Sequence, residues 1–293
     1  MKAKFFSFIS CFILFFSCTK NNSNPGNQDN PKFKLKTIFY LVDSVTLLCG
    51  NCPPIVTQES ENFIYDSSGR LTSIIVIVTT LSDDPVSVDT SAVYSYFYSD
   101  NTFLISSYTQ TINGYATNHL LTYNSENKII SDSVTNPQIS NNKVSYFQYN
   151  QGYIVVTDKQ TYPIGTQIIV DTMTIDDNNI TKEIIKKVVL SNPQNIWNED
   201  LTYSTTSYQN PLSLVNNISL WGSDYKNGVD AIFYNGEKFS NNLASQKITK
   251  YWSNNLPLTE YTSVYTAVLD TLGRVISVTN SSDGNGKTEY EYY

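Results

Sequence analysis

The sequence predicts an all-β protein made of antiparallel hairpins, and three observations support this fold class. The first is composition: the 293 residues include 22 Tyr, and only 15% of them are charged. Abundant Tyr, Thr, Val and Ile with little Lys, Glu and Ala favours strands joined by polar turns. The second is a turn motif that occurs twice, and the third is an alternation of residue types with a period of two between turns. A chain of this length can bury a large core in one domain.

The N-terminal residues predict a lipoprotein signal. Two lysines in Met-Lys-Ala-Lys precede the apolar run Phe5–Phe16, which is too short to cross a bilayer because a spanning helix needs about 20 residues. The ending Ser17-Cys18 resembles a bacterial lipobox, which implies cleavage before Cys18 and a diacylglyceryl thioether and an N-acyl chain, such as palmitate, on that cysteine. The alternative is an ordinary secretory signal in which Cys18 has no role. Two or more acyl chains anchor a protein stably without spanning the membrane.

We therefore expect a signal peptide at residues 1–17, a lipidated flexible tether at residues 18–32 and a single all-β domain at residues 33–293. The tether is predicted from its Asn, Pro, Gly and Ser content. Loss of the signal peptide, which holds two lysines and no acids, takes the formal net charge from −7 to −9. An acidic protein repels phosphate, so we expect no nucleic-acid partner. The expected location is the outer membrane of a cell envelope, with its periplasmic face and the cell surface both left open.

The turn motif D-x-x-G-R-[LV]-x-S-[IV] occurs twice, 204 residues apart. Asp in the first position can cap turn amides, and Gly in the fourth can take positive φ, so each copy predicts a hairpin turn. The two arginines are the only ones in the chain. We expect each to pair locally with its turn aspartate or with a neighbouring strand, the alternative being a bidentate site for a carboxylate or a sulfated sugar. The residues that define the two copies are Asp66, Gly69, Arg70, Asp270, Gly273 and Arg274.

Weaker copies of the turn begin at Asn124, Asn150 and Asp176, with a spacing of 26 residues. This period accommodates two strands and two turns, so one repeat is one hairpin. At typical strand lengths the domain would hold roughly 18 to 22 strands. The segment from Trp197 to Tyr251 fits the period poorly, and there we expect a longer loop or a short helix around Phe239–Gln246.

The Tyr-rich copies of this turn resemble the tyrosine–aspartate (YD/RHS-like) repeats of bacterial cell-surface proteins. Together with the lipobox, the Tyr-x-Asn-Pro-Leu segment at Tyr208–Leu212 and the C-terminal Tyr290–Tyr293, the chain is similar to a Bacteroidota lipoprotein family of unknown function with a porin-like fold. That resemblance implies a large antiparallel meander curled into an open sheet or a barrel. It implies no known reaction.

Cysteine and histidine offer few catalytic arrangements. Cys49-Gly50-Asn51-Cys52 resembles a thiol–disulfide motif, but Pro53-Pro54 follows it where a redox site would begin a helix, so we expect a structural disulfide between Cys49 and Cys52 in an oxidising envelope. His119 is the only histidine, and we expect a strand or turn residue with a structural role. We predict no metal site and no cofactor.

Acidic and aromatic residues give two further candidate sites. The adjacent acids could serve glycoside hydrolysis, but their neighbours predict solvated turns; they are Asp83-Asp84, Asp176-Asp177 and Glu199-Asp200. The Ser281–Gly286 segment resembles a calcium loop without its final glutamate and reads as a turn. The tryptophans could form a sugar-stacking platform or be core and pairing residues; they are Trp197, Trp221 and Trp252.

The functional prediction is a lipid-anchored envelope protein without enzymatic activity that binds a glycan, a peptide or another envelope protein. The first alternative is a glycoside hydrolase whose acid pair comes from separate strands. The second is a pore-like β-barrel, although Asn, Ser and Thr recur on both faces of many strands where a lipid-facing surface would be apolar. The oligomeric state is left open.

Overall fold

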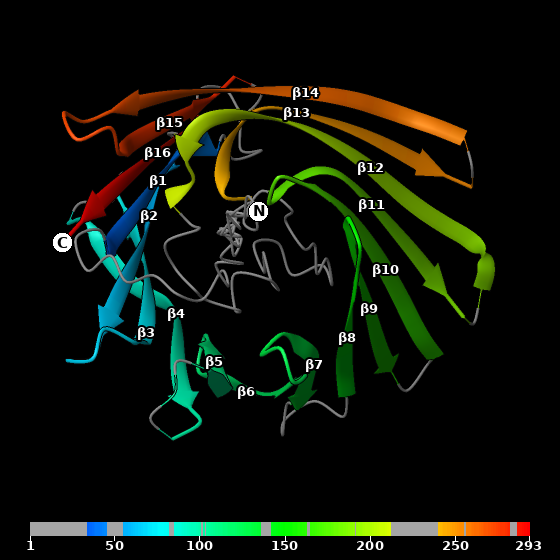
Figure 1. Cartoon of the computed structure of the whole chain (residues 1–293). Coiled ribbons are helices and arrows are strands. Elements are labelled where there is room, and N and C mark those ends of the chain that lie inside the picture. The colour runs from blue at the N-terminus through cyan, green and yellow to red at the C-terminus, as the bar shows by residue number, and fades with distance from the viewer. Residues whose placement is uncertain are drawn as a thin grey trace, which may run out of the picture.

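The computed structural model describes residues 34–45, 55–81, 85–100, 102, 104–135, 142–162, 165–190, 192–211, 240–254, 256–281 and 286–293. They form a closed antiparallel barrel of 16 strands, in which each strand pairs with its neighbours in sequence and the last closes on the first (Figure 1). This confirms the predicted all-β meander and decides between the open sheet and the barrel. No described helix is long and apolar enough to cross a membrane.

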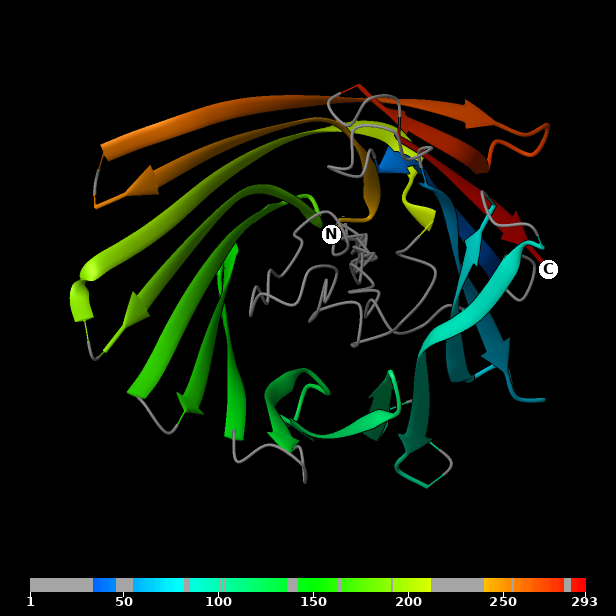
Figure 2. The same ribbon diagram turned by 180° about the vertical axis from the view of Figure 1, so that it is seen from behind.

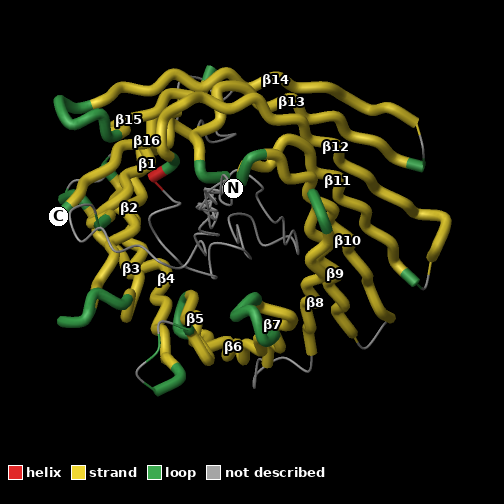
Figure 3. Tube along the Cα trace, viewed as in Figure 1, coloured by secondary structure: helices red, strands yellow, loops and turns green. Residues whose placement is uncertain are grey.

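The strands follow one another as a simple meander, with strands along most of the described trace and turns or short connections at both rims (Figure 3). They are β1 (Leu35–Val45), β2 (Ile55–Tyr65), β3 (Leu71–Thr80), β4 (Ser87–Tyr98), β5 (Ile105–Ile112), β6 (Tyr115–Tyr123), β7 (Ile129–Thr135), β8 (Asn142–Asn150), β9 (Tyr153–Tyr162), β10 (Gly165–Asp176), β11 (Asn179–Val189), β12 (Asn192–Gln209), β13 (Asn242–Ser253), β14 (Leu256–Leu269), β15 (Val275–Asn280) and β16 (Gly286–Tyr292).

Two expectations about these elements are wrong. The barrel has 16 strands rather than 18 to 22, because several strands are longer than the typical five or six residues; β12 alone has 18. The helix expected around Phe239–Gln246 is also wrong in its described part, because β13 begins at Asn242 and pairs with β12 on one side and β14 on the other. Cross-strand pairing of Ala244 and the residues after it outweighs local sequence preference here.

The core lies on the face of the sheet that turns toward the barrel interior. Side chains alternate between the two faces along a strand, so cross-strand partners share a face. Phe63 and Ile74 are such partners, as are Phe147 and Val156, and all four are at most 6% exposed. Buried clusters cover this inner face over β1–β6 and over β8–β12. Burial of these apolar and aromatic side chains is the main stabilising contribution.

The outward face mixes polar, charged and scattered apolar side chains. Lys182 and Lys186 lie within β11 on this face, and both are exposed. Lys250 of β13 forms an ion pair with Glu260 of β14 at 3.1 Å, again within the strands. Phe97 is 53% exposed on the same face. Charges therefore interrupt the apolar surface of the outward face over the described strands β11–β14.

The barrel wall is uneven in height. The strands β12–β14 have 18, 12 and 14 residues, whereas β15 and β16 have 6 and 7. Seen from either side, β12, β13 and β14 reach well beyond the two strands that follow them (Figures 1 and 2). Beyond the end of β15, one backbone edge of β14 therefore has no described strand beside it.

Candidate functional site

Both copies of the D-x-x-G-R motif form the same hairpin turn at the same rim of the barrel. In the β2–β3 turn, Oδ1 of Asp66 accepts hydrogen bonds from the backbone N–H groups of Ser68 and Arg70, each at 2.9 Å, and Nε of Arg70 donates to Oδ2 of Asp66 at 2.7 Å. Asp270 and Arg274 repeat these contacts at 2.9 and 2.6 Å in the β14–β15 turn. The backbone N–H of Arg70 and its guanidinium lower the pKa of Asp66. The arginines thus make the local contacts expected of them.

The fourth turn position takes positive φ in both strong copies and in one weak copy. The φ angles are +85° at Gly69, +77° at Gly273 and +59° at Asn127. Glycine adopts this region without a Cβ clash, and asparagine tolerates it better than most residues. In the weak copy, Oδ1 of Asn124 accepts the backbone N–H of Lys128 at 2.9 Å, so an amide oxygen replaces the aspartate carboxylate.

In two hairpins, a tyrosine hydroxyl at the end of the second strand donates a hydrogen bond to a backbone carbonyl at the start of the first strand. The hydroxyl of Tyr98 donates to the carbonyl of Leu71 at 2.6 Å, and that of Tyr292 donates to the carbonyl of Val275 at 2.7 Å. The guanidinium of Arg70 lies 5.0 Å from the Tyr98 ring centroid, so the turn cation also covers the tyrosine. Burial raises the pKa of Tyr98 to about 12. This geometry gives the recurring tyrosines and the basic turn residues a structural role.

Removing the turn carboxylate tests this role. Asp66→Ala removes the acceptor of three hydrogen bonds, and we expect it to lower the free energy of unfolding by about 1–2 kcal/mol, as for loss of a capping side chain. Asp66→Asn keeps an oxygen for the two amides and should lose less than half of that. Urea unfolding followed by fluorescence measures the stability of both variants. Equal losses would show that the hydrogen bonds from the two backbone amides contribute nothing.

A row of four buried carboxyl groups crosses the inner face of β9–β12. These residues, called the acidic row below, are Asp158, Asp171, Glu183 and Glu199, and they are 2%, 1%, 0% and 7% exposed. The register places each one diagonally from the next on adjacent strands. Diagonal neighbours on one face lie within reach of long side chains. The row is therefore a contiguous line of acids within the apolar cluster of β8–β12.

Hydroxyl and ammonium groups surround the acidic row. The hydroxyl of Tyr203 donates to Oε2 of Glu183 at 2.6 Å. At the β9 end, Nζ of Lys143 lies 3.6 Å from Oδ2 of Asp158. In the middle, the β10–β11 register makes Asp171 and Glu183 diagonal neighbours, and both carboxyl groups are fully buried. Burial and the Glu183 carboxylate raise the pKa of Asp171 well above its ordinary value.

Glu199 ends the row on β12. Burial and the nearby Glu183 carboxylate raise its pKa to about 7, while Lys247 and a hydrogen bond with Tyr251 act in the opposite direction. Its protonation therefore changes near neutral pH. Raised pKa values favour the neutral forms of Asp171 and Glu199, which reduces the repulsion among the four acids of the row.

The acidic row differs from the carboxylate arrangement of a glycosidase. Those enzymes place two carboxyl groups about 5–9.5 Å apart on either side of a sugar. Asp171 and Glu183 are instead diagonal neighbours on adjacent strands, and neither is more than 1% exposed. Neither carboxyl group is open to a sugar, so this pair acts within the barrel wall.

His119 lies in a second polar cluster on the inner face, in strand β6. Its Nδ1 is 3.0 Å from Oδ2 of Asp132, and its ring stacks on Tyr108 with centroids 3.9 Å apart. The Tyr108 hydroxyl donates to the same carboxylate at 3.4 Å. Nε2 of His119 is buried and has no hydrogen-bond partner among the described groups. The described residues hold no group of three or more His, Cys, Asp or Glu suited to a metal ion.

Several residues singled out in the sequence fall apart in space or lie outside the described residues. Trp197 and Trp252 belong to opposite faces, because Trp197 pairs with Ser253 while Trp252 pairs with Asn198; the two cannot share one platform. The interpretation of Glu199-Asp200 as a solvated turn is wrong, since both lie inside β12. Other predictions concern residues outside the described ranges, namely Cys18, Cys49, Cys52, Asp83-Asp84, Trp221 and most of Ser281–Gly286.

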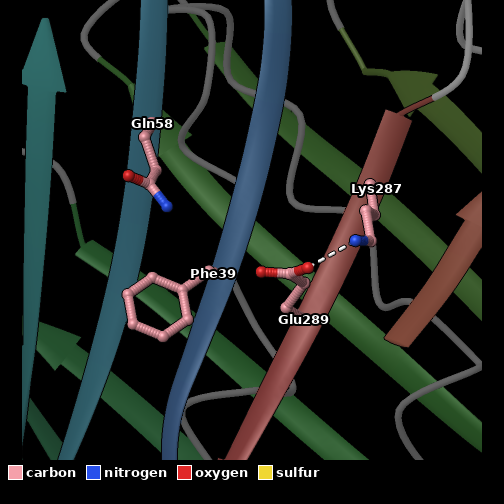
Figure 4. Close-up of a pocket in the computed structure, with 4 residues that line it drawn as sticks. All are labelled: Phe39, Gln58, Lys287 and Glu289. Carbon is pink, nitrogen blue, oxygen red and sulfur yellow. Dashed lines mark ion pairs between the residues drawn. The ribbon is translucent and has the colours of Figure 1, made fainter. Parts of the chain in front are cut away.

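A small pocket opens on the outward face where β16, β1 and β2 lie side by side (Figure 4). It is lined by Phe39, Gln58, Lys287 and Glu289 and has a volume of about 100 Å³. Binding sites for small organic ligands are typically 300–1,000 Å³. Lys287 and Glu289 form an ion pair with each other in one wall. The pocket is therefore too small to identify a ligand, and its charged groups are already paired.

Sequence reasoning missed the acidic row. Its members are far apart along the chain, and only the barrel register brings them together. One signal was available: Asp171 stands between the apolar residues Ile169 and Met173 on the inward face of β10. A charged residue in such a position needs a partner from a neighbouring strand.

Two solved structures are similar to the chain. One is described as a porin-like protein from Bacteroides uniformis ATCC 8492, with a TM-score of 0.53 and 16% identity, covering 90% of this chain and 98% of that chain. The other is a porin-like protein from Bacteroides vulgatus ATCC 8482, with a TM-score of 0.46 and 9% identity, covering 88% and 98%. No protein-family model and no curated protein matches the chain. The first likeness and the closed 16-stranded barrel together give the chain a porin-like fold.

Proposed function

We propose that the protein is a cell-envelope binding protein, attached to the membrane by a lipid on Cys18, whose barrel does not itself cross the bilayer. Its ligand is a peptide or an envelope protein, with a glycan as the other class, and it has no enzymatic activity. The lipid anchor rests on the signal sequence, and the fold rests on the described barrel.

The distribution of side chains between the two faces carries this proposal. A transmembrane barrel turns an apolar band toward lipid and a polar surface toward its interior. Here the inner face holds the buried apolar clusters, whereas Lys182, Lys186 and the Lys250–Glu260 pair lie within strands on the outward face. A lysine on the lipid face at the middle of a bilayer costs roughly 2–4 kcal/mol. This distribution favours a barrel that lies in water.

The residue pattern supports a binding function better than a catalytic one. Titratable groups of the inner face are engaged with one another: Tyr203 with Glu183, Lys143 with Asp158, and His119 with Asp132. The rim is stiffened by turns such as Asp66–Arg70. A rigid scaffold that carries polar loops is a common basis for recognition.

The experiment is a binding screen of the full chain, extracted from membranes in mild detergent, against glycan arrays, peptide arrays and purified envelope proteins. The proposal expects saturable binding to a member of one of these classes, without turnover of that ligand. Hydrolysis of a glycan, or selective ion conductance by the protein in planar bilayers, would contradict it.

A further inference from the structure

The first half of β14 has a backbone edge with no described strand beside it. β14 pairs with β13 from Leu256 to Val264, but it pairs with β15 only from Tyr265 onward. Residues 256–262 are all exposed, and Leu258 is 57% exposed. Figures 1 and 2 show β14 running along the barrel wall well past β15 from both sides.

The unpaired backbone groups on this edge point away from β13. Val264 fixes their direction: its N–H donates to Oγ of Ser281 at 3.1 Å, and its carbonyl accepts the N–H of Ser281 at 3.0 Å, both on the β15 side. Backbone groups alternate in direction along an antiparallel strand. Thr262 and Glu260 therefore turn their N–H and C=O groups to the same free side. A row of such groups is a template for another strand.

We propose that residues 258–262 of β14, called the β14 edge, bind an extended segment of a partner protein by strand addition, with a basic residue of that segment opposite Glu260. This inference rests on the proposed function as a binding protein and gives the partner its chemistry. Pro257 has no N–H and closes one end of the edge, while the Ser281 contact with Val264 closes the other.

The side chains on the two faces of the β14 edge set the partner's composition. On the outward face, Glu260 is 54% exposed even in its ion pair with Lys250, so it can face a second cation. On the inward face, Tyr261 is 56% exposed and its ring lies 5.9 Å from that of Tyr251. A partner residue opposite Tyr261 would extend this aromatic row, and aromatic cross-strand pairs stabilise sheets.

A second copy of the chain is a poor occupant of the β14 edge. Any two-fold antiparallel pairing within this short edge brings the two Glu260 carboxylates onto one face of the new sheet, directly or diagonally opposite. Each copy also carries a formal net charge of −7. Like charges in such positions destabilise a strand pair, whereas the same charges favour a basic partner.

The test uses the full chain and fluorescein-labelled heptapeptides of the pattern Ser-Thr-x-z-x-Thr-Ser, where x is Tyr, Val or Ser and z is Lys, Thr or Glu. Fluorescence anisotropy should show the tightest binding when x is Tyr and z is Lys. Binding should be about fivefold weaker when Glu replaces Lys at position z. Glu260→Lys should reverse this charge preference. No saturable binding by any peptide of the panel, or a charge preference that survives Glu260→Lys, would overturn the proposal.

Backbone pairing is tested separately from charge. N-methylation of the peptide amides that face the edge should weaken binding about tenfold, as for the loss of hydrogen bonds, whereas N-methylation of the alternate amides should not. Thr262→Pro removes an edge-facing N–H donor from the protein and should weaken binding of the unmethylated peptide to a similar extent. Thr262→Val is its control. Equal effects of the two methylation patterns would reject strand addition. A ligand found in the broader screen whose binding ignores Thr262→Pro would reject this edge while keeping the binding function.

Discussion

Phe63→Ala is expected to lower the free energy of unfolding by about 3–5 kcal/mol, the usual cost of truncating a buried phenylalanine. Phe63 is 1% exposed on the inner face of β2 and belongs to the cluster over β1–β6. The truncation leaves a cavity that the closed sheet cannot readily collapse, because β2 is held between β1 and β3 and Phe63 itself pairs with Ile74. Urea unfolding at constant pH, followed by circular dichroism, measures the loss.

Phe97→Ala is the matched control for Phe63→Ala. Phe97 lies on the outward face of β4 and is 53% exposed. We expect a loss of less than about 1 kcal/mol, as for most surface substitutions. Equal losses at Phe63 and Phe97 would mean that the inner face is not the core of the barrel.

Raising the pH from 5 to 8 is expected to destabilise the protein. The pKa of Glu199 is about 7 in the folded protein and 4.5 ordinarily, so the folded state binds more protons than the unfolded chain between these values. The free energy of unfolding therefore falls as pH rises across that window and levels off above it. The shift corresponds to about 3 kcal/mol at most. Asp171, with its raised pKa, acts in the same direction.

Glu199→Gln should reduce this pH dependence by more than half, because the amide does not titrate. Glu260→Gln is the control, since Glu260 lies in an exposed ion pair, and it should leave the slope unchanged. Tryptophan fluorescence in urea at pH 5, 6, 7 and 8 gives the four stabilities for each variant. A wild-type stability that is flat or rises between pH 5 and 7 would contradict the account of the acidic row.

Local chemistry made the fold class and the turns predictable from the sequence. Asp66 and Gly69 carry their turn geometry in their own side-chain and backbone properties, and Asn127 takes positive φ as an asparagine in glycine's place can. The strand number was overestimated because no local signal limits a strand such as β12 to typical length.

Non-local contacts could not be predicted. Asp171 and Glu183 are neighbours because the β10–β11 register places them diagonally on one face, and register depends on every pairing around the barrel. Glu199 and Asp200 read as one acidic pair in the sequence, yet adjacent strand residues point to opposite faces. The free edge of β14 likewise depends on the length of β15, its neighbour.

The proposed barrel keeps its apolar core inside and meets water outside. The most direct measurement is size-exclusion chromatography with circular dichroism on residues 19–293, which lack the lipidated cysteine, in buffer without detergent. We expect a monodisperse protein with a β-sheet spectrum and a cooperative unfolding transition. A chain that aggregates in buffer and acquires the same spectrum only in detergent micelles or lipid vesicles would contradict this proposal.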